Sequence, residues 1–451
     1  MKKIIIIYGI FLTAISFAAD YNSLLIKAQN GDSQAQYEVA KAYATGDGVV
    51  QNNALALKWL NLSIKNGSVD GENMLGVFYS NGLCGLEKDI EKSLSLLESA
   101  AEKGSLRAQE NLAKCYLYGI NTNQDFEKAF YYAEKAAVQN SAIGQGVLAY
   151  IYYTKGSIKK DLKKSLYFAQ KSFQQNDPMG LHILGLLYMD GKVVEKDLKK
   201  AFELISMSAM QKEYHPLFYH NLAYLYLRGD GTEKNVDKAV ELFTQAANMG
   251  YEDAEGVLAE IYLKKQNFSQ AFYWAQKASA NKDIRGDKIL AEIYLFGRGA
   301  EKNPQKAFEF CKKAADKGDI EAISNLASMY LLGDGTEKNM KKAFELHLKA
   351  AESGIVNSQK ILALFYCGKY GDAAEKDFAK AQYWAEKATA NGDFDAKMLL
   401  IVIRNKDNPG KVKSEMEKLK ETQGKTFSPK QINFIDNFIK NVENSAKNKE
   451  N

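Results

Sequence analysis

The sequence has few of the residues that carry metal and thiol chemistry, with only four histidines and four cysteines among 451 residues. Its five prolines and 33 glycines are too few for a collagen-like or linker-dominated chain. The 60 Lys and Arg nearly balance the 55 Asp and Glu, so we expect no nucleic-acid partner, which would require a basic stripe. The 46% share of hydrophobic residues excludes a wholly disordered chain. This length corresponds to about three domains or to one elongated repeat array.

A long apolar run occurs only at the start, where two lysines precede the apolar residues 4–17. Ser16 and Ala18 supply the small residues of a cleavage site, so we interpret residues 1–18 as a signal peptide. The run is shorter than the roughly twenty residues that span a bilayer, and an uncleaved anchor is the alternative. Cleavage would remove two lysines and reduce the net charge from +5 to +3. We therefore expect an exported chain, periplasmic or secreted, without stable membrane insertion after cleavage.

The rest of the chain repeats with a period of about 36 residues. In most copies a tyrosine is followed three residues later by glycine, as in Tyr79 and Gly82. The series consists of Tyr43, Tyr79, Tyr116, Tyr152, Tyr188, Tyr226, Tyr262, Tyr294, Tyr330 and Tyr366. The spacing is 36 residues except for steps of 37, 38 and 32. The short step spans residues 264–268, where the glycine-rich loop is deleted.

Each copy predicts a helix, a turn and a second helix. Leu75 and Tyr79 share one helical face, and Gly76 beside the leucine allows another helix to approach closely. Gly-x-Gly follows in several copies, and we interpret this loop as a helix cap, because a glycine just past a helix end adopts the left-handed conformation at little steric cost. The second helix begins near a Lys-Ala-Phe sequence and ends near Lys-Ala-Ala, followed by a Gly or Asn that stops it. A pair of such short helices cannot bury its apolar face alone, so neighbouring pairs must stack.

The pattern of each copy reads Leu-Gly-x-x-Tyr-x-x-Gly-x-Gly, followed by Lys-Ala and then by Lys-Ala-Ala-x-x-Gly. It resembles the Sel-one-like repeat (SLR) family, which is related to the tetratricopeptide (TPR) repeat. The resemblance implies an all-α fold, a right-handed α/α superhelical solenoid of about ten repeats over residues 19–398. Beyond it, we expect capping helices over residues 399–445 and a disordered tail over 446–451. Ser428 and Pro429 predict the start of an amphipathic cap helix that carries Ile432, Phe434, Ile435 and Phe438.

The sequence contains one weak signal of a catalytic site and one weak signal of a metal site. Ser157 and Lys160 have the Ser-x-x-Lys spacing of penicillin-recognising enzymes, but the partner motifs Ser-Asp-Asn and Lys-Thr-Gly are missing. A β-lactam or cell-wall hydrolase is therefore an alternative, and our main expectation is a protein without a catalytic step. His182 and His220 occupy matching positions of adjacent repeats, where polar groove residues are favoured over a metal site. We expect no metal and no cofactor.

The four cysteines lie in four different repeats, at positions 84, 115, 311 and 367. Four cysteines in an exported chain permit disulfides, and a Cys84–Cys115 pair is one alternative. Free thiols in small packing positions are favoured, because disulfide geometry is strict. We interpret His347, on a second helix, as a surface or partly buried packing residue.

In TPR solenoids the first helices line a concave groove, and the resemblance transfers this register to the present chain. The groove positions selected in this way are Arg107, Lys114, Tyr118, Tyr150, Tyr153, His182, Leu186, His220, Tyr224 and Arg228. Aromatic and arginine side chains of this kind dominate protein-binding surfaces, so a protein or peptide partner, from the envelope or from a host, is expected. Two alternatives are that these aromatics pack between helices and that the chain is a periplasmic structural spacer.

Overall fold

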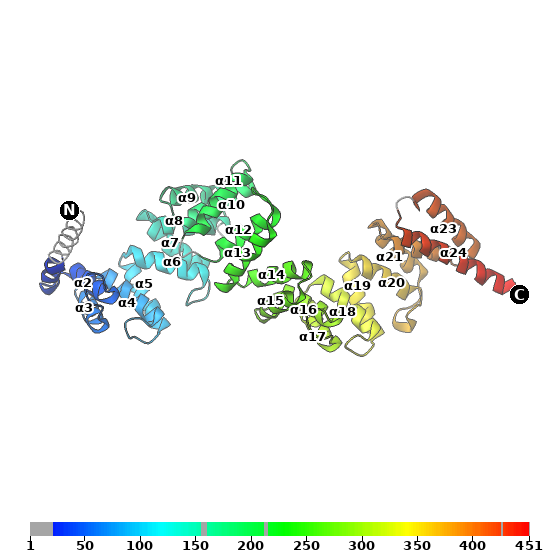
Figure 1. The fold of residues 1–451 in the computed structure, drawn as a ribbon, viewed down its shortest axis with the longest axis horizontal. Helices are drawn as coiled ribbons and strands as arrows, with labels where there is room; N and C mark the ends of the chain where they lie inside the picture. The colour runs from blue at the N-terminus through cyan, green and yellow to red at the C-terminus, as the bar shows by residue number, and fades with distance from the viewer. Residues whose placement is uncertain (1–20, 155–159, 212–214, 425–426, 451) are drawn as a thin grey trace, which may run out of the picture. The chain divides into compact units, whose positions relative to one another are not determined.

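The computed structural model describes residues 21–154, 160–211, 215–424 and 427–450. The chain divides into two compact units, Met1–Leu242 and Phe243–Asn451 (Figure 1). We call them the first and the second unit. Among the described residues, no helix has the length and apolar character that a membrane span requires. The predicted signal peptide, residues 1–18, lies outside the described residues.

Helices come in pairs, as the repeat pattern predicts. The first helices of the pairs are α2 Ser33–Thr45, α4 Val69–Asn81, α6 Leu106–Tyr118, α8 Ala142–Tyr153, α10 Pro178–Asp190, α12 Leu217–Arg228, α14 Asp253–Lys264, α16 Ile284–Phe296, α18 Ile320–Leu332 and α20 Val356–Tyr366. The second helices are α3 Asn53–Lys65, α5 Ile90–Glu102, α7 Phe126–Val138, α9 Leu162–Gln174, α11 Leu198–Met210, α13 Val236–Asn248, α15 Phe268–Ala280, α17 Pro304–Asp316, α19 Met340–Glu352 and α21 Phe378–Ala390. The chain continues with α22 Phe394–Arg404, α23 Pro409–Gln423 and α24 Pro429–Glu450, and a 3₁₀ turn, η1, covers Gly371–Ala373.

Most consecutive helices contact one another within each unit, and several first helices also contact the next first helix. The predicted all-α solenoid of helix pairs is therefore confirmed. The predicted loop deletion is also present, because only three residues, 265–267, join α14 to α15.

Helix ends in the repeats are fixed by capping. At the start of α18, Asp319 Oδ1 accepts a hydrogen bond from the Ala322 amide at 2.7 Å. At its end, Gly333 has a left-handed φ of 83°, which glycine adopts without a steric penalty. The predicted stop residues of the second helices all have positive φ as well: Gly67, Gly104, Asn140, Asn176, Gly250, Gly318 and Gly354.

The second glycine of the Gly-x-Gly motif has a role beyond the helix cap that we predicted for this loop. A Cβ at Gly335 would lie 1.9 Å from the carbonyl oxygen of Pro304, the first residue of the preceding repeat's second helix. The equivalent distance from Gly231 to the Leu198 carbonyl oxygen is also 1.9 Å. This glycine therefore allows one repeat to touch the backbone of the repeat before it.

A lysine lies over the ring of the repeated tyrosine in most copies. The ammonium nitrogen is 4.4 to 5.4 Å from the ring centroid, within the range of a cation–π interaction. The pairs are Lys92 and Tyr79, Lys128 and Tyr116, Lys164 and Tyr152, Lys200 and Tyr188, Lys306 and Tyr294, Lys342 and Tyr330, and Lys380 and Tyr366. The lysine belongs to the first turns of the second helix, so the interaction joins the two helices of one repeat.

A polar side chain of the first helix also binds the residue that directly follows the second helix of the same repeat. In the third repeat, Gln139 Nε2 donates to Gln109 Oε1 at 2.9 Å. In the eighth repeat, an ion pair replaces the two amides, with Lys317 Nζ at 2.6 Å from Asp287 Oδ2. Both first-helix residues precede the repeated tyrosine by seven positions, and sequence reasoning missed them.

His347, on α19, is completely enclosed, so our interpretation of a surface or partly buried residue is wrong. Its Nδ1 lies 3.0 Å from Ser358 Oγ, which in turn lies 2.8 Å from Ser324 Oγ. Burial lowers the pKa of His347 from 6.5 to about 4, because the charged imidazolium would lose its hydration. The equivalent position in α17 is the buried Cys311, which shows that this register belongs to the core.

Acidification from pH 7 to pH 5 is expected to weaken the second unit through His347. Below pH 6.5 the unfolded chain protonates this imidazole, whereas the folded chain resists protonation down to pH about 4, so stability falls as the pH falls through this window. At pH 5, this difference in protonation lowers the free energy of unfolding by about 2 kcal/mol. Urea unfolding, followed by the fluorescence of Trp274 and Trp384 in a chain with Trp59→Phe, measures it. His347→Leu should lose about 2 kcal/mol less over the same interval, and an unchanged pH dependence would contradict the assignment.

The C-terminal helices form a separate apolar cluster. Met398 of α22 packs with Val412, Met416 and Leu419 of α23 and with Ile435 of α24. The last helix starts as predicted, since Ser428 N donates to Gln431 Oε1 at 2.8 Å and Gln431 N donates back to Ser428 Oγ at 3.4 Å.

Three details of this region differ from the sequence prediction. Phe434 is exposed, because it neighbours the enclosed Ile435 and consecutive helical residues point in different directions. α22 runs across residue 398, at which we ended the repeats, because Met398 and its neighbours are buried in helical spacing. α24 continues through 446–450, in place of the predicted tail, since Ala, Lys and Glu favour helix.

Candidate functional site

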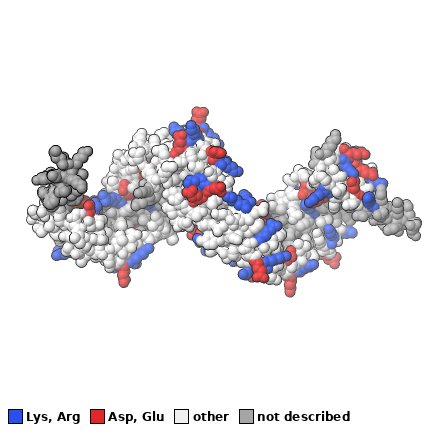
Figure 2. All heavy atoms as spheres, in the orientation of Figure 1, with Lys and Arg blue, Asp and Glu red and all other residues white. Residues whose placement is uncertain are grey.

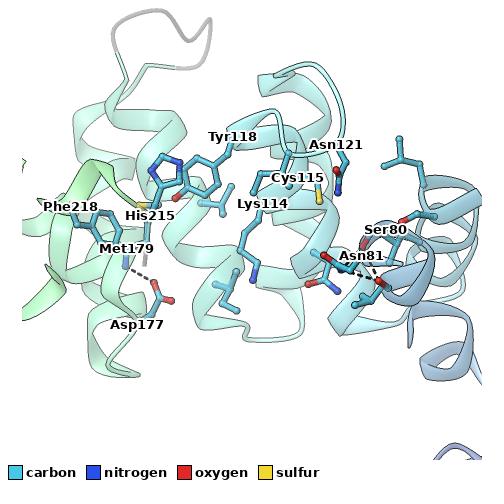
Figure 3. A pocket seen from close by; sticks show the side chains of 18 residues that line it. Ser80, Asn81, Lys114, Cys115, Tyr118, Asn121, Asp177, Met179, His215 and Phe218 are labelled. Carbon is cyan, nitrogen blue, oxygen red and sulfur yellow. Dashed lines mark hydrogen bonds between the residues drawn. The ribbon is translucent and has the colours of Figure 1, made fainter. Parts of the chain in front are cut away.

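A cavity of about 570 Å³ opens on the first helices of the first unit (Figure 3). We call it the first cavity. Its polar side chains are Ser80, Asn81, Ser93, Asn111, Lys114, Tyr118, Asn121, Asp177 and His215. Its apolar side chains include Val77, Leu97, Ile143, Val147, Met179 and Phe218. The lining therefore mixes apolar side chains with polar groups that can orient a ligand.

A stacked aromatic pair closes one side of the first cavity. The His215 ring lies on the Tyr118 ring with centroids 3.8 Å apart and an interplanar angle of 15° (Figure 3). Tyr118 ends α6, whereas His215 comes from the segment between α11 and α12, three repeats further along the chain. Burial lowers the pKa of His215 from 6.5 to about 4, so the imidazole is neutral at pH 7. Burial also raises the pKa of the Tyr118 hydroxyl.

Lys114 and Asp177 supply the charges of the first cavity. Asp177 caps α10, since its Oδ2 accepts hydrogen bonds from the amides of Met179 at 3.0 Å and Gly180 at 3.2 Å, and from Ser172 Oγ at 2.8 Å. Burial raises the pKa of Asp177, and these hydrogen bonds and the charge of Lys114 oppose the rise. Among the described residues, Lys114 has no hydrogen bond or ion pair, and it is half-buried. The ammonium group is therefore available to a ligand.

His182 does not reach the surface, so it is not available to the groove in which we placed it. Its Nδ1 lies 3.4 Å from Ser208 Oγ, and its Nε2 lies 2.9 Å from Asn221 Nδ2. Ser208 donates its hydroxyl to the Ile205 carbonyl, so Nδ1 of His182 carries the proton and Nε2 accepts. Burial lowers the pKa of His182 from 6.5 to about 3. Phe218 stacks on this histidine at 4.3 Å and covers it.

The remaining predicted groove residues lie on first helices outside the first cavity. His220 is buried and packs edge-to-face on Tyr224, and the exposed Arg228 stacks over the same Tyr224 ring at 5.2 Å. Two further contacts are the hydrogen bonds Arg107 Nη1 to Tyr37 Oη, 3.3 Å, and Tyr153 Oη to Asp190 Oδ2, 3.3 Å. Tyr150 and Leu186 are half-buried on α8 and α10. Of the ten predicted residues, the first cavity brings together Lys114 and Tyr118.

Comparison with known proteins decides the family. Ten segments of the chain match the Sel1 repeat: residues 33–68, 69–105, 106–141, 143–177, 178–213, 216–251, 260–283, 289–319, 320–355 and 357–393. The chain belongs to the Sel1 repeat family. Sel1 repeat proteins are generally protein-interaction scaffolds, and the family is typically non-enzymatic.

Solved structures of Sel1 repeat proteins resemble the chain at low identity. A protective antigen of uropathogenic Escherichia coli, which displays an SLR fold, is 24% identical, with 94% of each chain covered and a TM-score of 0.64. A Sel1 repeat protein from Oxalobacter formigenes is 22% identical, covering 76% of this chain and 90% of its own, with a TM-score of 0.32. Cysteine rich protein B of Helicobacter pylori is 30% identical, covering 30% of this chain and 96% of its own, with a TM-score of 0.24. The likeness to the Escherichia coli antigen shows the shared fold.

Sequence reasoning missed several residues of the site in this Sel1 repeat protein. Asp177 was hidden among the helix caps, because many repeats have an Asp or Ser at the same place. His215 follows the two-residue lengthening that gives the 38-residue step, and this irregularity was the available signal. Phe218 occupies a register that holds Gly or Ala in most Sel1 repeats of the chain, such as Gly180 and Ala322.

The other chemistry suggested by the sequence finds little support in the described part of the Sel1 repeat chain. Ser157 of the Ser-x-x-Lys pattern lies outside the described residues. No group of three or more His, Cys, Asp or Glu side chains in the described part is placed to hold a metal ion. All four cysteines are free thiols in the structure, and Cys115 lines the first cavity. On the displayed face, basic and acidic side chains are interspersed (Figure 2).

Proposed function

We propose that this protein is an exported, non-enzymatic scaffold that binds a protein or peptide on the first helices of its first unit. The observation that supports this most strongly is the first cavity, whose lining mixes apolar and polar side chains and in which the half-buried Lys114 has no ion-pair partner among the described residues. Desolvation of such a cation is costly, and a carboxylate or carbonyl group of a bound chain would offset that cost.

The stacked rings of Tyr118 and His215 favour a peptide over a small polar ligand. Flat aromatic surfaces provide contact area with little loss of conformational entropy, and the neutral imidazole adds a hydrogen-bonding group. The apolar side chains beneath them would take up a side chain of the partner. Binding would involve several contacts along the repeats and no covalent step.

The pattern of residues 1–18 supports export, and an exported chain would meet its partner in the cell envelope or in a host. The alternative of a structural spacer has no ligand and predicts no specific capture. The hydrolase alternative depends on Ser157 and is not supported by any described group.

Capture from an envelope extract tests the proposal. The bait is the mature chain, residues 19–451, together with two charge-reversal variants, Lys114→Glu in the first cavity and Lys163→Glu on the exposed start of α9. A specific partner should be retained by the parent and by Lys163→Glu, and should fall about tenfold with Lys114→Glu at unchanged helicity. Equal capture by both variants would place binding elsewhere, and no specific capture would favour the spacer.

A further inference from the structure

The second unit has a cavity of its own, of about 460 Å³, on the first helices α14, α16 and α18. We call it the second cavity. Its apolar floor includes Ile289, Leu295 and Met329. Many of the residues that line it lie at the same distance from the repeated tyrosine as residues of the first cavity. The first helices of repeats 7 to 9 therefore form a cavity with the same positions of the repeat.

Two large apolar side chains are exposed at the rim of the second cavity. Phe296 is 58% exposed and Leu332 is 60% exposed. Each follows the repeated tyrosine by two positions and ends its helix, the place that Tyr118 occupies in the first unit. Arg298 lies over the Phe296 ring at 5.4 Å, so this ring already faces a cation. Neighbouring exposed apolar side chains beside a cavity are typical of a protein-binding surface.

The charge available in the second cavity is negative. The carboxylates of Glu260, Glu292 and Asp334 line it and have no ion pair or side-chain hydrogen bond among the described residues. The two basic side chains of the cavity are occupied, since Lys288 binds Asp319 and Glu321 at 3.1 and 2.6 Å.

The other basic side chain, Arg285, is held by Asp283 at 2.6 Å and by Asp253 at 3.4 Å. A bound cation would therefore meet unpaired carboxylates without displacing an existing pair. The two cavities have opposite charges at the same position of the repeat. Glu260 and Glu292 precede their tyrosines by two positions, and at this position the first cavity has Lys114.

We propose that the second cavity binds a basic–apolar peptide segment of a partner protein, with a lysine or arginine beside a large apolar side chain. The cation is bound by Glu260, Glu292 and Asp334, and the apolar side chain packs on Phe296 and Leu332. Charge-assisted hydrogen bonds to half-buried carboxylates are stronger than those in open solvent. This site requires the opposite charge from the first cavity, and it does not depend on the function proposed there.

Fluorescence anisotropy with defined peptides tests this site on the full mature chain. The probe is a labelled octapeptide, Gly-Gly-Leu-Lys-Phe-Lys-Gly-Gly, and the matched probe has glutamate in place of both lysines. The basic peptide should bind, and the acidic peptide should bind at least tenfold more weakly. Added salt should weaken the basic peptide further, because the contact is electrostatic. Failure of the basic peptide to bind at millimolar concentration, or equal binding of both peptides, would overturn the proposal.

Matched variants locate the binding. Glu292→Gln should weaken the basic peptide about tenfold, and Leu332→Ser should weaken it severalfold. Glu309→Gln, on the exposed side of α17, removes the same charge outside the cavity and should leave binding unchanged. Lys114→Glu should also leave it unchanged, which separates this site from the first cavity. Equal effects of Glu292→Gln and Glu309→Gln would assign the peptide to general surface charge and overturn the site.

Discussion

Gly335→Ala is expected to destabilise the second unit by about 3 kcal/mol. The added Cβ would lie 1.9 Å from the Pro304 carbonyl oxygen, so the two repeats have to move apart. Gly335 also has a φ of 72°, which alanine adopts only with strain. Hydrogen exchange of the full chain, measured by mass spectrometry, should show amides of α17 and α18 exchanging on the order of 100-fold faster.

Gly318→Ala is the matched control for this contact. Gly318 is in the same unit and has a φ of 89°, but no other part of the chain lies within 4 Å of a Cβ built there. Gly318→Ala should therefore lower the free energy of unfolding by about 1 kcal/mol, through backbone strain alone. If the two substitutions had equal effects, the contact between repeats would contribute nothing beyond the strain.

Lys317→Met is expected to lower the free energy of unfolding of the second unit by about 3 kcal/mol. The Asp287 side chain is only 1% exposed, and it accepts from Lys317 Nζ and from Ser279 Oγ, both at 2.6 Å. Without the ammonium group, a buried carboxylate keeps a single hydroxyl donor, and its desolvation is no longer offset. Urea unfolding followed by Trp274 and Trp384 fluorescence should show a lower midpoint for the variant.

A double variant distinguishes loss of the ion pair from loss of packing. Adding Asp287→Leu to Lys317→Met removes the unpaired carboxylate and should recover most of the lost stability, because an apolar pair can replace a buried ion pair. Lys312→Met, at an exposed position of α17, the helix that ends just before Lys317, is the control for the substitution itself. A double variant no more stable than Lys317→Met would show that the carboxylate is not the source of the effect.

The helix pairs were predictable from the sequence because their signals are local and repeated ten times. Gly333 ends a helix through its own φ, and the shortened step at residues 264–268 can only shorten a loop. Capping and periodicity depend on a few neighbouring residues, so each copy confirms the others.

The candidate site was less predictable, because it depends on contacts between distant repeats. The stacking of His215 on Tyr118 joins residues that are three repeats apart, and its geometry depends on how the helix pairs of the first unit curve. The enclosure of His182 depends on Phe218, a large side chain at a register that is usually small. A register transferred from the family places side chains on the correct helix, but it does not show which of them a neighbouring repeat covers.

The contacts within each helix pair and those between neighbouring pairs have a consequence for how such a chain can evolve. The amide and ion pairs, such as Gln109 with Gln139 and Asp287 with Lys317, are closed within one repeat, so a duplicated repeat brings both partners with it. The contact across the junction uses a glycine and a main-chain carbonyl, which any residue supplies; the carbonyl belongs to leucine, phenylalanine or proline in different copies. Gene duplication can therefore lengthen or shorten the array by whole repeats without redesigning the junctions, while the surface residues of each copy diverge toward new partners.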